Sequence, residues 1–287
     1  MNRQFHPSVI FIYYLLLIAE VMFTTDPIIQ LTALIGGAVS LGRLPGGKTV
    51  MWGIIMAAAV VLTNPLLVRN GSTPLFFLNG KPVTAEALSA GISLALSLCG
   101  MFVICMGLNR AVDSDSFVSL FAKATPKLAL VVSMTFRLIP LFVRRINAVS
   151  SAAKAQGLMS SRSLTDRIKH SLLIFRTVFM WSLENAMDTA SSMTARGYGS
   201  AERTAFTLIR FGKSDTIFLA AVIASSVPVF TGEAVGALSF SFYPVISPLM
   251  LSPLSFVSRA SFGVLVLLPF GVRVLEKIKW NYYISKI

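Results

Sequence analysis

Two short segments, Ser151-Ala-Ala-Lys-Ala-Gln-Gly157 and Ser191-Ser-Met-Thr-Ala-Arg-Gly197, repeat one local pattern 40 residues apart. Both lie in a charge-dense stretch, residues 110–213, which carries 15 lysine or arginine residues and 6 acidic residues. Each glycine follows a helix-compatible run, at the position where a left-handed residue commonly ends a helix. The repeat therefore predicts two helices with matching ends. This arrangement is suited to binding another protein at two points.

The residues ahead of each glycine carry apolar side chains at spacings of three and four, which is typical of a helix with one apolar face. The first series is Leu138, Phe142, Ile146, Val149 and Ala153, and the second is Leu172, Phe175, Phe179, Leu183, Met187 and Ala190. Pro126 and Pro140 mark helix starts or kinks. We therefore expect several amphipathic helices lying flat under a membrane, because the stretch is too long and too regular for a passive loop.

The rest of the chain has the composition of a membrane protein. Of 287 residues 55% are hydrophobic and only 13% are charged, where soluble domains have about a quarter charged. The apolar residues form runs, which predict membrane spans at 8–24, 28–41, 49–68, 86–108, 216–230 and 254–273. Residues 28–41 are few for a span, and their Gly36-Gly37 pair predicts close packing against a neighbouring helix.

These patterns predict an all-α integral membrane protein with about six transmembrane helices and long amphipathic cytoplasmic helices. Three regions follow: N-terminal transmembrane helices at 1–109, the cytoplasmic region at 110–214, and C-terminal transmembrane helices at 215–287. Residues 234–251 are also apolar but contain Pro244 and Pro248. We favour a broken, re-entrant or interfacial segment there, because a further span would export the basic C-terminal tail.

The basic residues indicate the orientation. Placing 110–213 in the cytoplasm leaves only Arg69, Lys81 and Arg259, of 25 basic residues, on the outside. The sequence thus predicts a multi-pass protein of the cell membrane with both termini in the cytoplasm. The positive-inside rule, by which cytoplasmic loops are rich in lysine and arginine, explains the net charge of +13 together with contact to anionic headgroups or an acidic partner. Nucleic acid is therefore not an expected partner.

Two features of the predicted spans have competing interpretations. Gly42-Arg-Leu-Pro-Gly-Gly47-Lys48-Thr49 matches the P-loop pattern. A P-loop needs a preceding buried strand, whereas the flanks here are predicted spans, so we interpret the segment as a tight cytoplasmic turn with Arg43 and Lys48 as anchors. Glu20 is an acid inside a span and a functional candidate for that reason, but no basic partner lies at helical spacing.

Nothing in the sequence predicts a metal or cofactor site. Cys99 and Cys105 lie in one apolar segment and indicate neither a disulfide framework nor a metal site. His6 and His170 are isolated, so a solvated or helix-capping histidine is favoured over a metal ligand for both.

Arg196 is predicted to lie in the last turn of a helix that a glycine ends. From a protruding helix end, a guanidinium can form a forked hydrogen bond with a carboxylate of a partner. The alternative is an arginine that complements the helix dipole or meets lipid phosphate. The matching segment Ala155-Gln156-Gly157 favours the partner interpretation.

With these residues in place, the chain resembles the transmembrane T component of energy-coupling factor (ECF) transporters. The likeness covers most of the chain and is strongest over 136–198. There Phe136-Arg137-Leu-Ile-Pro140 precedes the first motif, and Ala195-Arg196-Gly197 matches the family's Ala-Arg-Gly motif. The first motif, Ala155-Gln156-Gly157, departs from it at Gln156.

The resemblance implies long coupling helices whose two motif ends dock on two ABC-type ATPase subunits. The implied docking residues are Ala155, Gln156, Gly157, Ala195, Arg196 and Gly197. At the first motif, either Gln156 docks through neutral hydrogen bonds, or Lys154 or Arg162 supplies the charge. The chain would be a non-catalytic subunit without a cofactor, since its partners bind ATP.

The implied function is to transmit ATP-driven movement to a separate substrate-binding membrane protein, the S component, for uptake of a vitamin, another micronutrient or a metal ion. Two alternatives belong to other classes. A stand-alone secondary transporter predicts internal repeats between membrane halves and transport without ATPases. A membrane-bound enzyme would need a cluster of aspartate, histidine or cysteine residues at the membrane surface.

Overall fold

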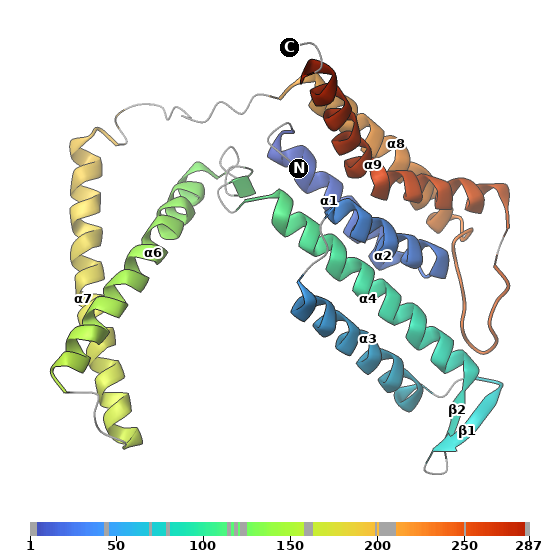
Figure 1. Cartoon of the computed structure of the whole chain (residues 1–287), viewed down its shortest axis with the longest axis horizontal. Coiled ribbons are helices and arrows are strands. Elements are labelled where there is room, and N and C mark those ends of the chain that lie inside the picture. The colour runs from blue at the N-terminus through green and yellow to red at the C-terminus, as the bar shows by residue number, and fades with distance from the viewer. Residues whose placement is uncertain are drawn as a thin grey trace. The chain divides into compact units, whose positions relative to one another are not determined.

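The computed structural model describes residues 5–42, 46–68, 71–78, 81–113, 116, 117, 120, 125–157, 163–198, 200, 211–249 and 251–284. The chain forms two compact units (Figure 1). The first, which we call the bundle, comprises Met1–Asp113 and Arg210–Ile287. The second comprises Ser114–Ile209 and contains two long helices, which we call the helix pair.

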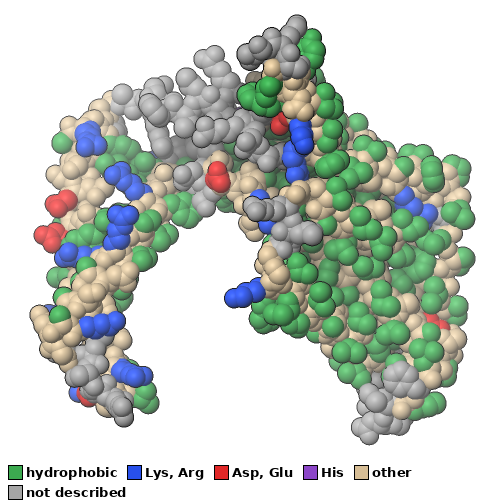
Figure 2. Space-filling model, in the orientation of Figure 1, with side chains coloured by type: hydrophobic (Ala, Val, Ile, Leu, Met, Phe, Trp, Pro, Cys, Tyr) green, Lys and Arg blue, Asp and Glu red, His purple; other side chains and the backbone are tan. Residues whose placement is uncertain are grey.

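The bundle contains the helices that correspond to the predicted apolar segments. They are α1 (Pro7–Phe23), α2 (Pro27–Leu41), α3 (Gly47–Leu67), α4 (Ala85–Ala111), α8 (Lys213–Ala234) and α9 (Pro253–Ile284). By length and composition α3, α4, α8 and α9 can each cross a membrane, while α1 and α2 are shorter apolar helices. The prediction of an all-α membrane protein is confirmed, and the visible face of the bundle is largely hydrophobic (Figure 2).

Local sequence signals start three of these helices. His6 precedes Pro7, and its Nδ1 accepts a hydrogen bond from the Ser8 N–H at 3.2 Å, so the predicted capping role is confirmed for His6. Asp26 precedes Pro27 and caps α2 in the same way, while Thr84 caps α4 through the Ala87 N–H. Proline at the first helical position fits because its missing N–H would have no partner in the helix.

The core of the bundle lies where α1, α2, α8 and α9 meet. Its large, fully buried apolar side chains include Tyr13 and Leu17 from α1 and Phe262 and Leu265 from α9. In Figure 1, α4 lies between α2 and α3, and α2 also packs against α9. A Cβ atom on Gly36 would lie 2.5 Å from Val266 Cγ1, which confirms the predicted close packing of α2.

Buried polar contacts tie distant segments together at both ends of the bundle. At one end the His6 N–H donates to Asp215 Oδ1 at 2.7 Å, and the Gly212 N–H donates to Oδ2 at 2.8 Å, which joins the starts of α1 and α8. At the other end Arg259 of α9 donates to Asp26 Oδ2 through Nε at 2.8 Å, within a salt bridge of 2.7 Å. Arg259 is one of the three basic residues predicted to lie on the outer side of the membrane, and it has a buried acidic partner.

The connection between α3 and α4 contains a β-hairpin that the sequence analysis did not predict. Its strands are β1 (Pro74–Leu78) and β2 (Lys81–Thr84), paired antiparallel. The Glu86 carboxylate at the start of α4 accepts hydrogen bonds from the hydroxyl groups of Ser72 at 3.0 Å and Thr73 at 2.9 Å. The hairpin is therefore fixed to the first turn of α4.

The apolar segment after α8 is not a helical span. Residues 235–249 contain no helix, and α9 begins only at Pro253. Ala237 and Leu238 are buried, and the Phe240 N–H donates to Thr25 Oγ1 at 3.3 Å. This confirms the expectation of a broken segment that is held against the protein.

The segment resembling a P-loop connects two helices. Gly42 ends α2 with φ +65°, and Gly46 precedes α3, while residues 43–45 lie outside the described part of the chain. A helix therefore stands where a P-loop requires a strand, which agrees with the interpretation as a turn. The left-handed backbone at Gly42 explains the glycine there.

Candidate docking site at two helix ends

The helix pair consists of α6 (Pro126–Ala155) and α7 (Leu164–Ala195). Pro126 is the first residue of α6, and Pro140 lies within the helix without ending it. Both helices end at the predicted glycine motifs. The sequence prediction of two long helices that close at these motifs is confirmed.

The two helices contact each other near their middles. The rings of Phe142 and Trp181 meet edge to face with centroids 5.8 Å apart, and the Arg145 guanidinium lies 5.3 Å from the Trp181 ring centre. Phe142 lies 13 residues before Ala155, and Trp181 lies 14 residues before Ala195. At about 1.5 Å per residue, each motif end projects about 20 Å beyond this contact. Figure 1 shows α6 and α7 running in opposite directions, so the two ends lie at opposite ends of the pair.

The two ends have nearly the same backbone geometry. Gln156 has φ −80° and ψ 2°, and Arg196 has φ −82° and ψ 4°. The glycines that follow are left-handed, with φ +74° at Gly157 and +80° at Gly197. A residue with a side chain would be strained at these two positions, which accounts for the glycines. The sequence repeat is therefore a repeat of backbone structure.

The hydrogen bonds at the two ends also correspond. The Gly157 N–H donates to the Lys154 carbonyl at 3.0 Å, and the Gly197 N–H donates to the Thr194 carbonyl at 3.0 Å. At the second end the Tyr198 N–H also donates to the Met193 carbonyl at 3.0 Å, which completes a Schellman motif. These bonds satisfy carbonyl groups that a helix end otherwise leaves without donors.

All six predicted docking residues are exposed. Ala155, Gln156 and Gly157 close α6, and Ala195, Arg196 and Gly197 close α7. Within the described residues, no acidic side chain forms a salt bridge with Arg196. Its guanidinium, with five donors in a planar fork, is therefore available to a carboxylate or phosphate outside this part of the chain.

The structure describes two of the three candidates for docking at the first end. Gln156 occupies the same cap position as Arg196. Lys154 is exposed but lies two residues earlier, which places its side chain about 160° away around the helix axis. Arg162 lies outside the described residues. Of the two candidates that the structure describes, Gln156 is the one that occupies the same position at the end of α6 as Arg196 occupies at the end of α7.

The two predicted apolar stripes have different surroundings. Four residues of the α6 stripe are shielded: Leu138, Phe142 and Val149 are half-buried and Ala153 is buried, and Phe142 contacts Trp181 of α7. The fifth, Ile146, is exposed. The stripe on α7 remains exposed, and Phe175 stacks on Phe179 at 5.8 Å between ring centroids. Its exposed side chains are Leu172, Phe175, Phe179, Leu183 and Met187.

A second exposed apolar face lies on α6, and the sequence analysis missed it. It is formed by Val132, Phe136, Ile139 and Val143. Their spacings of four, three and four residues are the helical signal that could have revealed it. In Figure 2 hydrophobic side chains of the helix pair lie beside lysine and arginine side chains. Exposed apolar faces of this kind are typical of surfaces that contact protein or membrane.

Glu20 lies in the bundle and thus in a different unit from the helix ends. It is 1% exposed, and neither carboxyl oxygen has a hydrogen-bond partner among the described residues.

The chain was compared with known protein families and proteins. A family model described as CbiQ, cobalt transport protein, matches residues 2–206 and so includes both helix ends. The chain is 25% identical over 237 residues to the energy-coupling factor transporter transmembrane protein EcfT of Limosilactobacillus fermentum, which covers 74% of this chain and 86% of that protein. It is 36% identical over 95 residues to EcfT of Listeria innocua, covering 32% of this chain and 36% of that protein.

A further similarity is of a different kind. A Bifidobacterium longum protein, whose provisional name is ABC transporter ATP-binding protein, is 26% identical to the chain over 184 residues. The match covers 59% of this chain but 23% of that protein. A segment similar to this chain therefore forms a minor part of a longer polypeptide with an ATP-binding name.

Proposed function

Because the chain belongs to the CbiQ family of cobalt transport proteins and is a transmembrane component of an ECF transporter, we propose that it couples two ABC-type ATPases to a separate S component. ATP-driven movement of the ATPases would pass through the helix pair to the S component, which carries the substrate. In this proposal the chain is non-catalytic, and ATP binds to the partner subunits. The protein lies in the cell membrane with both termini in the cytoplasm.

The observation that carries the proposal is the matching geometry of the two helix ends. Two equivalent ATPase subunits require two equivalent attachment points. The ends at Gln156 and Arg196 have the same cap conformation and lie about equally far from the contact between the helices. A rigid pair held at its middle would transmit a movement of either end to the other.

The proposed ATPase partners have support from charge and from the Bifidobacterium protein. The stretch 110–213 has 15 basic and 6 acidic residues, so an acidic groove on a partner would complement it. The Bifidobacterium protein joins a segment similar to this chain to a longer polypeptide with an ATP-binding name. A single polypeptide that contains both segments is expected when the two proteins act in the same assembly.

The exposed apolar faces of the helix pair support contact with a membrane partner. Apolar contacts have no fixed direction, so helices with such faces can slide or tilt while they remain bound. The stripe that includes Phe175 and Phe179 offers this kind of surface to the S component. The cargo is proposed to be a vitamin, another micronutrient or a transition-metal ion, and the name of the family favours the metal.

The test is co-purification of the tagged chain with both ATPases and the S component. Arg196→Glu is expected to insert normally into membranes but to lose the ATPases, because a desolvated charge pair broken at one partner costs about 2–5 kcal/mol. The matched control is Arg176→Glu, an exposed arginine on the same helix about 30 Å from the end. It should keep the ATPases.

Unchanged co-purification of the Arg196→Glu variant would contradict the proposed docking. Equal loss in both variants would indicate a general charge effect instead of a specific end. Uptake by proteoliposomes that contain the chain without ATPases would favour the alternative of a secondary transporter.

A further inference from the structure

The β-hairpin stands where α3 ends and α4 begins, and the proposed function does not use it (Figure 1). In its register Phe77 pairs with Pro82 and Phe76 pairs with Val83. Opposed residues of a sheet share a face and successive residues alternate, so Phe77 and Val83 lie on opposite faces. Val83 is buried, and its strand β2 contacts α3 and α4. The hairpin therefore turns one face toward the bundle and the other away from it.

The face turned away from the bundle is apolar. Phe77 is 70% exposed, and Leu75, at an irregularity in the register of β1, is 57% exposed. We call these two side chains the hairpin face. Residues 71–80 carry no charged side chain. Because the face of an antiparallel sheet that meets water is usually polar, this composition indicates surroundings other than water.

Hydrogen bonds fix the position of the hairpin relative to α4. The Glu86 carboxylate accepts hydrogen bonds from the Ser72 hydroxyl at 3.0 Å, the Thr73 hydroxyl at 2.9 Å and the Thr73 N–H at 3.2 Å. The Ala85 N–H donates to the Thr73 carbonyl at 3.1 Å. The hairpin face is thus held at the level where α4 begins.

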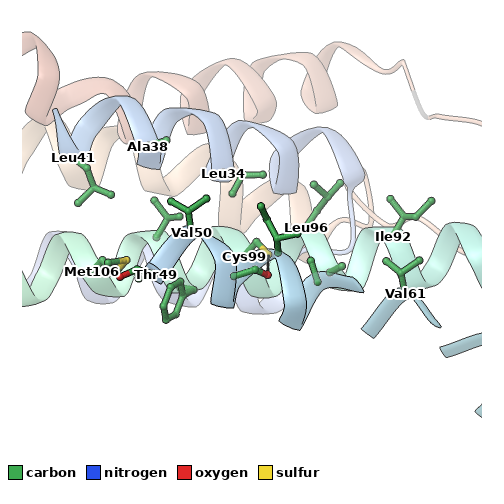
Figure 3. Close-up of a pocket in the computed structure, with 16 residues that line it drawn as sticks. Leu34, Ala38, Leu41, Thr49, Val50, Val61, Ile92, Leu96, Cys99 and Met106 are labelled. Carbon is green, nitrogen blue, oxygen red and sulfur yellow. Dashed lines mark hydrogen bonds between the residues drawn. The ribbon is translucent and has the colours of Figure 1, made fainter. Parts of the chain in front are cut away.

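Helix α3 indicates the depth of this level in a membrane. It has 21 residues and is about 31 Å long, which matches a hydrocarbon core of about 30 Å. Within α3, which is described along its whole length, Pro65 is the only buried residue. On its side toward α2 lies an apolar groove of about 460 Å³, with Leu34 and Val50 in its walls (Figure 3). If α3 spans the hydrocarbon, the hairpin that follows it lies at the level of the lipid headgroups.

We propose that Leu75 and Phe77 insert into the boundary between lipid headgroups and acyl chains, and so anchor the adjoining ends of α3 and α4 to the membrane surface. A two-stranded sheet leaves backbone N–H and C=O groups unpaired along its edges, so the hairpin itself stays out of the hydrocarbon. At the boundary these groups meet water and headgroups while the two side chains reach the acyl chains.

The size of the hairpin face favours lipid over a partner protein. Each large side chain buries at most about 250 Å², so Leu75 and Phe77 together bury less than about 500 Å². A stable protein interface needs about 800 Å² from each partner. The apolar surface also continues onto α3, where Leu62 and Leu67 are exposed. The hairpin face therefore extends the surface that α3 presents to lipid, and the inference does not depend on the ATPases or the S component.

Spin labels test the depth of the hairpin face. The full chain, purified with the subunits that stay bound to it, carries a label at Phe77→Cys in a background without Cys99 and Cys105. It is reconstituted in vesicles of phosphatidylethanolamine and phosphatidylglycerol. Power saturation then compares collisions of the label with oxygen, which concentrates in lipid, and with a nickel chelate, which stays in water.

We expect collisions with oxygen to dominate at Phe77→Cys, although less strongly than at Leu62→Cys, which lies farther into the span. Dominant collisions with the nickel chelate would place the hairpin face in water and overturn the proposal. Low collision rates with both reagents would show that protein covers this face, and would overturn the lipid assignment.

A label at Leu75→Cys leaves Phe77 in place and tests its contribution. Adding Phe77→Glu should raise the collision rate with the nickel chelate several-fold, because a charged side chain withdraws from the acyl chains. Val245→Glu is the matched control, since Val245 is also exposed but lies between α8 and α9, and it should leave the label unchanged. An equal rise in both variants, or no rise in Phe77→Glu, would overturn the proposed anchor. Leu75, Phe77 and Val245 are exposed, so the variants are expected to fold, which their elution volumes check.

Discussion

The bundle and the helix pair use their side chains in opposite ways. In the bundle, apolar side chains pack against one another and polar side chains bind groups far away in the sequence. Asp26 binds Arg259, and the Asp215 carboxylate accepts a hydrogen bond from the backbone N–H of His6. In the helix pair, α7 has no buried residue in its described length, and its apolar stripe and its charged end are exposed.

This difference shows what each unit is built to do. The bundle has contacts that fix its own structure, and it contains the helices that can cross a membrane. In the described residues of the helix pair, α6 and α7 contact each other around Phe142, Arg145 and Trp181, while the α7 stripe and both helix ends are exposed. Changes in the bundle should therefore alter stability first, and changes in the pair should alter assembly first.

The largest effect is expected from the buried ion pair of the bundle. Arg259→Met would leave Asp26, whose side chain is 2% exposed, as an unpaired buried charge. Removing one partner of a buried pair typically costs about 3–5 kcal/mol. The measurement is thermal unfolding of the purified protein in detergent, followed by the fraction that remains monodisperse.

The control for this prediction restores neutrality. Asp26→Asn in the Arg259→Met background should recover much of the lost stability, because asparagine removes the charge and can still cap α2. Wild-type stability of Arg259→Met alone would show that the bundle does not depend on this pair. It would also weaken the contrast between the two units.

A smaller effect is expected at the contact between α6 and α7. Trp181→Ala removes an edge-to-face aromatic contact, worth about 0.5–1.5 kcal/mol, and a cation–π contact, worth about 0.5–1 kcal/mol at an exposed site. If this contact between α6 and α7 is weakened, the two helix ends at Gln156 and Arg196 would move independently. ATPase binding should persist, while ATP hydrolysis drives less uptake.

Pulsed electron paramagnetic resonance measures this loss directly. Spin labels on Ser151→Cys and Ser192→Cys, in a background without Cys99 and Cys105, should give a broader distance distribution in Trp181→Ala. Trp280→Ala in the bundle is the control and should leave the distribution unchanged. An unchanged distribution in Trp181→Ala would mean that other contacts hold the pair together.

The sequence predicted the membrane helices and the ends of the helix pair for identifiable physical reasons. A helix satisfies its own backbone groups in lipid, so long apolar runs had to be helical. Gly157 and Gly197 marked helix ends because glycine adopts the left-handed cap at little cost. The exposed positions of Gln156 and Arg196 followed from those caps.

Other features depend on tertiary contacts that a local pattern does not contain. Asp26 and Arg259 are 233 residues apart, so no spacing rule pairs them. The strands of the hairpin, such as Pro74–Leu78, are too short to stand out between two apolar helices. Periodicity showed that α6 and α7 each have an apolar face, but it could not show that most of the α6 stripe is shielded while the α7 stripe is exposed.

The smallest effect is expected from making the two helix ends alike. Gln156→Arg places an arginine on a backbone that already matches that of Arg196, so no rearrangement is needed. A charged hydrogen bond is worth about 1 kcal/mol more than a neutral one, so ATPase binding should be unchanged or up to about fivefold tighter. Titration of the ATPases onto the immobilised chain measures this change.

Lys154→Gln is the control and should have little effect, because Lys154 points to another side of α6. A clear loss of assembly in Gln156→Arg would show that the first end docks differently from the second despite their shared backbone. Loss only in Lys154→Gln would identify Lys154 as the source of the charge.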